Sequence, residues 1–310
     1  MTEAAPAHVV LAAALRRLGA SVRDTRERFL ASESAPSATD DDALHDFRVT
    51  LRRIRTYLRV ARFLWNSKRI ERIEYELRYF ARTTGTLRDD EVLRDTLASL
   101  RLPEIAATDV HAWLARRARV ARSRRRSILR IVREGPPAQE TDSRSTKTIR
   151  PLDNVLDKLD RHLDVTPDLV LSTSELARDA IERAARDVRE AARAEVGDEE
   201  AMHALRIREK RLRYTAELFA DELGEDAPRL LQHATKMQRR LGDLHDLDEA
   251  LRTVARARGL AMPTKQAAIA ALRIARKACA AKVEPHLIDA RELEAQRGSS
   301  HDVPREHSLA

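Results

Sequence analysis

Apolar residues recur every three or four positions along most of this chain, which is the spacing of amphipathic α-helices. An eleven-residue pattern of this kind occurs twice, over 45–55 and 203–213, with no Gly or Pro in either copy. The apolar positions of each copy fall on one side of a helix. The opposite side carries a basic stripe, formed by His45, Arg48, Arg52, Arg55 and Arg59 in the first copy and by His203, Arg206, Lys210 and Arg213 in the second. Like charges at this spacing repel one another, so we expect each stripe to face an anionic partner.

The same periodicity predicts helices throughout both halves of the chain. In the first half they span 8–31, 43–65, 67–83, 89–100 and 109–133. In the second half they span 151–163, 174–195, 198–221 and 227–241, followed by a short helix that ends at 258 and a long one over 264–294. Gly85 and Gly242, at matching places in the two halves, are predicted to form turns before the short helices.

These elements predict an all-α fold of two helical bundles, each with about four main helices. The repeated order of elements suggests a pseudo-twofold relation between the bundles, which would place both basic stripes on a shared channel or concave surface. The predicted boundaries are 1–135 for the first bundle, 136–150 for a linker without periodic apolar residues, 151–295 for the second bundle and 296–310 for a disordered tail.

Composition supports this interpretation. Of 310 residues, 43% are hydrophobic and 35% are charged, whereas glycine (8 residues) and aromatic residues (4%) are scarce, which favours helix. The formal net charge of +8 is modest, so the clustering of basic residues matters more than their total. The single cysteine, Cys279, excludes a disulfide within the chain and is compatible with a reducing compartment. No basic segment precedes the short apolar run 9–15 and no apolar run reaches roughly 20 residues, so we expect a cytoplasmic protein without membrane insertion.

The two copies resemble the signature of the CHAD family, the conserved-histidine α-helical domain. The resemblance rests on the His and Arg positions of both copies and on the elements Gly85…Asp89 and Gly242…Asp246, and it extends over 8–292. It implies a two-bundle helical protein that binds inorganic polyphosphate in a basic channel and can associate with polyphosphate granules. Some members carry a fused triphosphate tunnel metalloenzyme domain. The chain has no β-rich segment to form that domain, so it resembles a stand-alone member.

We expect polyphosphate to contact basic residues on and around the two stripes. On the repeated helices these are His45, Arg48, Arg52, Arg53, Arg55, Arg59, His203, Arg206, Arg208, Lys210, Arg211 and Arg213. Elsewhere they are Arg82, Arg88, Arg119, Arg122, Arg126, Lys236, Arg239 and Arg240. Arginine suits phosphate because its planar guanidinium stays charged and donates two parallel hydrogen bonds. The alternative for each stripe is a solvated helix face paired with Asp and Glu.

The histidines and the nearby aspartates each have two interpretations. His45 and His203 could donate hydrogen bonds to phosphate, since a polyanion favours the charged imidazole, or could be neutral and bonded to a backbone group. Two clusters follow the two glycines and could hold Mg²⁺ or Ca²⁺: Asp89-Asp90-Glu91 and His245-Asp246-Leu247-Asp248-Glu249. Asp commonly caps a helix at such a position, so capping is the preferred interpretation, and no metal or cofactor is predicted.

Two other functions stay open from the sequence. Single-stranded nucleic acid also offers a regular phosphate backbone, but its binding sites usually include aromatic stacking platforms, and only Tyr57 and Tyr214 lie near the stripes. An enzyme that acts on polyphosphate would need clustered carboxylates to hold metal ions. The chain contains no Walker A, GxSxG, HExxH or CxxC motif. The leading prediction is therefore non-enzymatic binding of polyphosphate.

Overall fold

The computed structural model of this chain describes residues 5–32, 42–137, 148–167 and 169–299, with side chains up to 287. Its elements are α1 (Ala7–Ala31), α2 (Ala43–Ala61), α3 (Ser67–Thr83), α4 (Gly85–Ala98), α5 (Glu104–Glu134), α6 (Leu152–Leu163), α7 (Thr173–Ala191), α8 (Glu199–Leu218), α9 (Ala220–Leu223), α10 (Asp226–Ala255) and α11 (Met262–Ser299). The predicted all-α fold class is confirmed. Most of the predicted linker, and the tail from residue 300 onward, lie outside the described residues.

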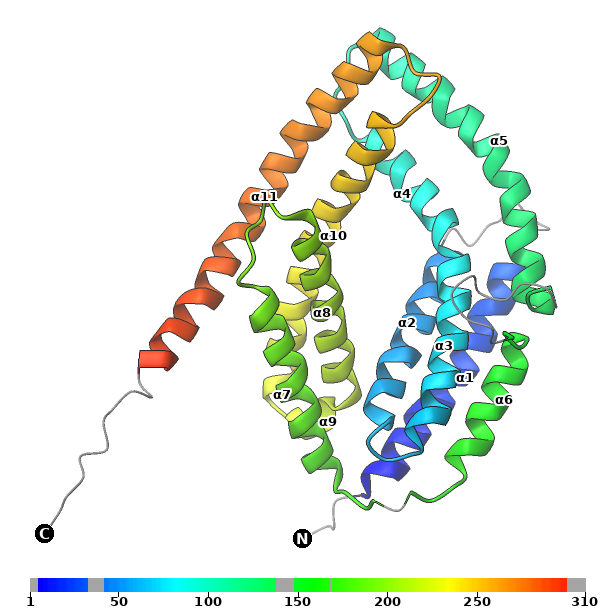
Figure 1. Cartoon of the computed structure of the whole chain (residues 1–310), viewed down its shortest axis with the longest axis vertical. Coiled ribbons are helices and arrows are strands. Elements are labelled where there is room, and N and C mark those ends of the chain that lie inside the picture. The colour runs from blue at the N-terminus through cyan, green and yellow to red at the C-terminus, as the bar shows by residue number, and fades with distance from the viewer. Residues whose placement is uncertain (1–4, 33–41, 138–147, 168, 300–310) are drawn as a thin grey trace, which may run out of the picture.

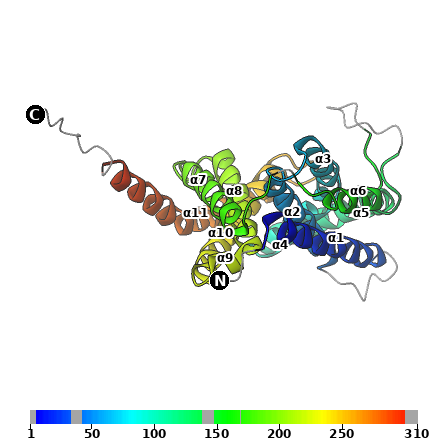
Figure 2. The same cartoon turned by 90° about the horizontal axis from the view of Figure 1, so that it is seen from below.

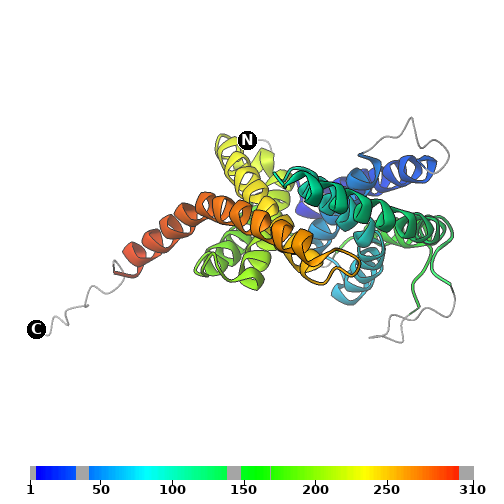
Figure 3. The ribbon, with the colours of Figure 1, turned by 90° about the horizontal axis from the view of Figure 1, so that it is seen from above.

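The helices form two groups, one on each side of the molecule (Figure 1). In the first group α2 packs against α1 and α3, and in the second α8 packs against α7 and α10, which in turn packs against α11. The helices that carry the two stripes, α2 and α8, contact each other where the groups meet (Figure 2). The long helices α5 and α11 contact each other at the end of the molecule that is nearest the viewer in Figure 3, and from there they run in opposite directions.

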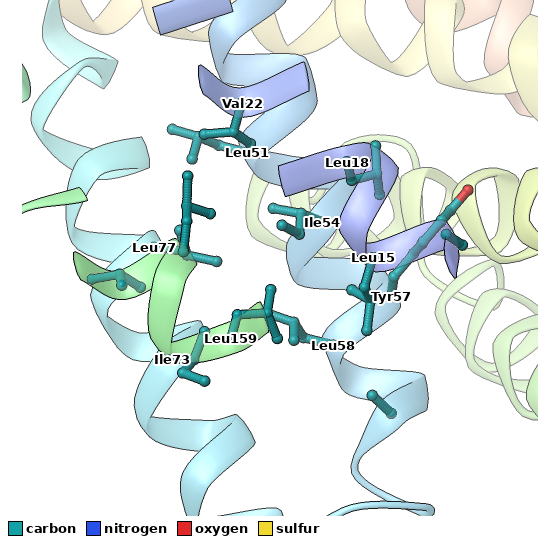
Figure 4. Packing of buried hydrophobic residues seen from close by; sticks show 14 of the residues in the cluster. Leu15, Leu18, Val22, Leu51, Ile54, Tyr57, Leu58, Ile73, Leu77 and Leu159 are labelled. Atoms are coloured by element: carbon teal, nitrogen blue, oxygen red, sulfur yellow. The ribbon is translucent and has the colours of Figure 1, made fainter. Parts of the chain in front are cut away.

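The apolar faces of the helices form the core. In the first group Leu51 and Ile54 of α2 meet Leu15 of α1, Leu77 of α3 and Leu159 of α6, all of them buried (Figure 4). Burying each side chain of this size stabilises the fold by about 1.5–3 kcal/mol. The core therefore holds α2 with its apolar face inward, which leaves the first basic stripe to face away from it.

A separate apolar cluster joins the two halves of the chain. Leu97 of α4 and Trp113 of α5 are buried against Val254 of α10 and Leu272 of α11. This cluster fixes α4 and α5 relative to α10. These three helices lie opposite the two basic stripes.

α6 packs with the first group of helices. It contacts α3 and α1, and its Leu156 and Leu159 are buried in their core. Its residues fall in the range 151–295 that the sequence assigned to the second bundle, so the chain returns to the first group before it crosses to α7.

The predicted turn at Gly242 is wrong. α10 continues without a break through this residue, because Leu241 and Leu244 on either side of it are buried and hold the segment in the helix. The preferred capping role of the two aspartates is also wrong. Asp246 lies in the middle of α10, and Asp89 lies in the second turn of α4, which begins after Thr84.

Other helix ends differ by a few residues from the prediction. α2 ends at Ala61 rather than at 65, and Asn66 then caps α3 by accepting a hydrogen bond from the Arg69 backbone nitrogen at 3.2 Å. α5 begins at Glu104, directly after Pro103, and α11 reaches Ser299.

Within the described residues, none of the helices combines the length and the apolar character needed to cross a membrane.

Candidate functional site

A cavity of about 300 Å³ lies between α2, α4, α5, α8 and α10, where the two basic stripes face each other. Seven Lys and Arg side chains from all five helices line it: Arg48, Arg52, Arg88, Arg117, Arg206, Lys210 and Arg239. His45 and His245 line it as well. These residues are far apart along the chain, in its two halves. Packing of the halves against each other brings them onto one surface.

Lys210 is the most buried cation of the cavity, with 9% of its surface exposed. Burial lowers its pKa to about 6, and the charges of Arg52 and Arg206 contribute to the same shift. The carboxylate of Asp246 acts in the opposite direction but is too weak to offset it. Among the described residues, no carboxylate oxygen lies within the 4.0 Å that would make an ion pair with Lys210. An anion in the cavity would supply the missing negative charge.

The arginines beside Lys210 are partly buried, and they differ in their hydrogen bonds to the protein. Arg206 has a buried Nε without a hydrogen-bond partner among the described residues, and burial lowers the pKa of its guanidinium. Arg48 donates hydrogen bonds to the carbonyl of Ala81 at 2.8 Å and to Oγ1 of Thr84 at 3.3 Å. Arg48 therefore also closes the end of α3, a structural role that the sequence analysis did not assign to it.

Five carboxylates line the same cavity, contributed by α4 and α10: Asp89, Asp90, Asp243, Asp246 and Glu249. Asp90 is neutralised by Arg117 at 2.6 Å and by Arg124 at 3.0 Å. Burial raises the pKa of Asp246, against the opposing charges of Arg206 and Lys210. Among the described residues, no group of three or more His, Cys, Asp or Glu side chains could hold a metal ion.

The histidines of the two stripes have different surroundings. Burial and the charge of Arg88 lower the pKa of His45, so its imidazole is neutral at pH 7. His203 lies beside His245 of α10, with 3.3 Å between their Nδ1 atoms, so one ring donates and the other accepts. Burial lowers the pKa of His203, and burial together with the charge of Arg206 lowers that of His245 to about 3.

Further along α2, the basic stripe is paired with carboxylates. Glu74 of α3 accepts from Arg59 at 2.8 Å and lies 3.7 Å from Arg55. Arg53 pairs with Glu217 of α8 at 3.0 Å and its guanidinium lies over the ring of Tyr214. These three arginines support packing of α2 against its neighbours, and they are less available to an external anion.

Arg208 and Arg213, in the corresponding part of α8, also have partners within the protein. Arg208 donates to the carbonyl of Asp187 at 3.2 Å, and Arg213 lies 3.6 Å from Glu217. Burial and the charge of Arg59 lower the pKa of Arg211. The open part of the site is therefore the end of the stripes that faces α4 and α10.

The remaining predicted residues lie outside the cavity. Arg82 is exposed in the last turn of α3, and Arg119, Arg122 and Arg126 are exposed on α5. Lys236 is exposed on α10. Arg240 contacts His286 of α11, on a different side of α10 from the cavity.

Arg117 and His245 line the cavity but were not among the residues expected to contact polyphosphate; His245 was considered only as part of a possible divalent-cation cluster. The repeat contained a signal for His245, because it stands 157 positions after Arg88, the same offset that relates Gly85 to Gly242. For Arg117 no such signal exists, because its position depends on the angle at which α5 passes α4.

Comparison with known proteins agrees with this fold. The family model of the CHAD domain matches residues 10–255. The chain belongs to the CHAD family. This family is linked to the binding of inorganic polyphosphate.

Two uncharacterised proteins of Mycobacterium tuberculosis, from strains CDC 1551 / Oshkosh and ATCC 25618 / H37Rv, are each 31% identical to this CHAD protein over 240 residues. The match covers 73% of the chain but 42% of each relative, so the chain spans less than half the length of these relatives.

Two solved structures share the fold. The crystal structure of the CHAD domain from the plant Ricinus communis has a TM-score of 0.57 at 22% identity, covering 94% of this chain and 92% of that one. PptA from Streptomyces chartreusis has a TM-score of 0.58 at 20% identity, covering 94% and 100%. At these identities the likeness is one of fold.

Proposed function

We propose that this CHAD protein binds inorganic polyphosphate, without catalysing its cleavage, in the cavity between α2 and α8. The observation that carries the proposal is Lys210, which is buried near the charges of Arg52 and Arg206 and has no carboxylate within ion-pair distance among the described residues. Burial among like charges disfavours the charged form of Lys210, and an anion in the cavity would offset this cost. Polyphosphate offers a negative charge on every internal phosphate and can contact both stripes at once.

Single-stranded nucleic acid is a weaker candidate for the same cavity. Its bases would need aromatic side chains on which to stack, and no Phe, Tyr or Trp is among the described residues that line the cavity. Tyr214 is fully buried and Tyr57 is nearly so, which removes both from contact with a ligand.

A paired titration tests the choice of ligand. The protein is titrated in one buffer with polyphosphate and with single-stranded RNA of the same number of negative charges. We expect polyphosphate to bind at least about tenfold more tightly, because its directly linked phosphates bring more negative charge into the cavity than the ribose-spaced phosphates of RNA, whose bases find no stacking surface there. Equal or tighter binding of RNA would contradict the proposal.

We also propose that the protein is not a phosphatase of its ligand. The carboxylates in the cavity are those that a metal-dependent enzyme would use, so the test includes them. With polyphosphate and Mg²⁺ we expect phosphate release no faster than in a blank, both for the unaltered chain and for Asp246→Asn. Steady release that is abolished by Asp246→Asn or Asp89→Asn would show catalysis instead.

The cellular setting follows from the same proposal. A polyphosphate-binding protein of this kind would work in the cytoplasm and associate with polyphosphate granules. A fluorescent fusion tests this: it should concentrate on granules in cells that store polyphosphate, and it should be diffuse in cells that lack it.

A further inference from the structure

A second hollow, larger than the cavity, lies between α4 and α5. Its volume is about 690 Å³, within the range of about 300–1,000 Å³ that is typical of small-molecule sites. Leucine, valine and alanine side chains form most of its wall. The ion pair between Asp90 and Arg117 forms its border with the cavity, because both residues line both spaces. We call this second hollow the α4–α5 groove.

The sequence of α5 explains why the groove is open. Residues of α5 that face it follow a spacing of three and four, and the ones in the middle are small: Ala115, Ala118 and Ala121. α4 and α5 both run away from the loop that joins them (Figure 1). The small alanine side chains do not fill the space between the two helices, so a hollow remains along them.

The two ends of the groove differ in chemistry. Near the loop between α4 and α5 the wall is formed by Leu97, Leu100 and Leu102. At the other end the same face of α5 carries Arg122 and Arg125. The groove is thus apolar at its closed end and cationic at its open end.

Arg122 and Arg125 provide the positive charge of the open end. Arg125 donates to Oγ of Ser32 at 2.7 Å and its guanidinium lies over the ring of Phe29. Among the described residues, no carboxylate oxygen lies within 4.0 Å of Arg122 or Arg125.

The acidic residues of the rim are already paired. Glu91 binds Arg88 at 3.1 Å, Asp95 binds Arg94 at 3.1 Å, and Asp90 binds Arg117. The open end therefore has uncompensated positive charge, which is complementary to an anionic head group.

We propose that the α4–α5 groove binds a monomeric, single-chain amphiphilic anion such as a fatty acid. Its acyl chain would lie along the alanines toward Leu97 and Leu102, and its carboxylate would meet Arg122 and Arg125. A purely apolar solute would leave the two guanidinium groups without an anion. Inorganic phosphate would leave the apolar walls in water. The amphiphile satisfies both, and this site is independent of polyphosphate binding in the cavity.

Calorimetric titration with dodecanoate, kept below its critical micelle concentration, tests the proposal on the full chain. We expect one saturable site. Ala118→Trp, which fills the groove from an exposed position, should weaken binding at least about tenfold. Arg122→Gln should weaken it about tenfold through loss of a charged hydrogen bond. The matched control is Arg130→Gln, which removes an exposed arginine of α5 outside the groove and should leave binding unchanged.

The proposal would be overturned by the absence of saturable dodecanoate binding, by unchanged dodecanoate binding in Ala118→Trp, or by equal binding of the cationic dodecyltrimethylammonium. Binding to phosphatidylglycerol vesicles without binding of dodecanoate would also overturn it, because it would assign the groove to a membrane surface. Helical circular dichroism and polyphosphate binding are measured on each variant, so a loss of fold or of the cavity is distinguished from loss of the groove site.

Discussion

Lys210 shows how a single position in the repeat acquires its properties from packing. In sequence it is one basic residue of a stripe, equivalent to Arg52 in the other copy. In the folded chain it is buried near Arg52 and Arg206, so its ammonium loses hydration, and among the described residues no carboxylate comes within ion-pair distance of it. Its pKa of about 6 means that it is largely neutral at pH 8 when the cavity holds no anion. A polyanion would restore its charge.

This leads to a prediction about protons. At pH 8, binding of polyphosphate should take up about one proton, because the anion raises the pKa of Lys210 above the pH of the solution. Affinity should therefore fall as the pH rises above 6. Titration calorimetry in buffers with different ionisation enthalpies measures the uptake. Lys210→Gln should abolish it, whereas Lys282→Gln, at an exposed site on α11, should not. An uptake that survives in Lys210→Gln would assign the proton to another group.

The free energy of unfolding should also depend on pH through the proton of Lys210. The unfolded chain holds the Lys210 proton up to the ordinary pKa of 10.5, while the folded chain holds it only to about 6. The unfolded state thus binds more protons between these values, and this group makes the fold more stable as the pH rises through that window. Lys210→Gln should flatten this dependence in urea denaturation. An equally steep dependence in the variant would show that Lys210 is not the cause.

At the scale of the helices, the boundaries of α10 differ most from those predicted from the sequence. Gly242 looked like a turn because its counterpart Gly85 stands between two helices, but here a buried apolar face continues on both sides of the glycine. Its φ is not positive, and a Cβ built on it meets nothing within 4 Å. Gly242 therefore has no conformational need to be glycine. Gly259, which follows α10, has φ of +84° and does.

The two glycines should respond in opposite ways to alanine. Gly242→Ala should raise the free energy of unfolding by about 0.5–1 kcal/mol, since alanine loses less backbone entropy in a helix. Gly259→Ala should lower it, because alanine is strained at this φ. Urea denaturation of both variants measures the difference. If Gly242→Ala were the destabilising variant, α10 would be interrupted at this point after all.

The helices that carry the stripes could be predicted, and their contacts could not. The 3.6-residue spacing identified α2 and α8 and assigned Leu51 and Leu212 to buried faces, as they are. Sequence spacing does not give the rotation of one helix against another. This is why Arg240 was expected at the site yet contacts α11, and why Arg117 was not expected and lines the cavity.

At the scale of the whole molecule, the cavity exists because the two halves pack against each other at two places. α2 contacts α8, and the cluster around Trp113 and Val254 joins α4 and α5 to α10 and α11. Trp113 is 4% exposed and lies under the guanidinium of Arg117, which lines the cavity. The second contact therefore both stabilises the fold and positions a basic residue of the site.

The two tryptophans separate these effects. Trp113→Ala should cost about 3–5 kcal/mol of stability and also weaken polyphosphate binding, because α4 and α5 lose their place against α10. Trp65→Ala, in the core of the first group, should cost a similar amount while the folded fraction binds normally. Thermal unfolding and polyphosphate titration at a temperature where both variants are folded make the comparison. Normal binding by Trp113→Ala would mean that the α5 side of the cavity does not contribute.

The salt dependence of polyphosphate binding tests the central claim most directly. If the seven Lys and Arg residues that line the cavity all contact phosphate, the single-strand coefficient of about 0.7 per contact gives a slope of log K against log salt of about −5. Replacing Arg52, Arg206 and Lys210 with Gln should reduce the slope by about 2. Replacing Arg130, Arg178 and Arg256, three exposed arginines outside the cavity, removes the same charge and should leave the slope unchanged. An unchanged slope in the first variant, with a loss in the second, would place the binding site elsewhere on the surface.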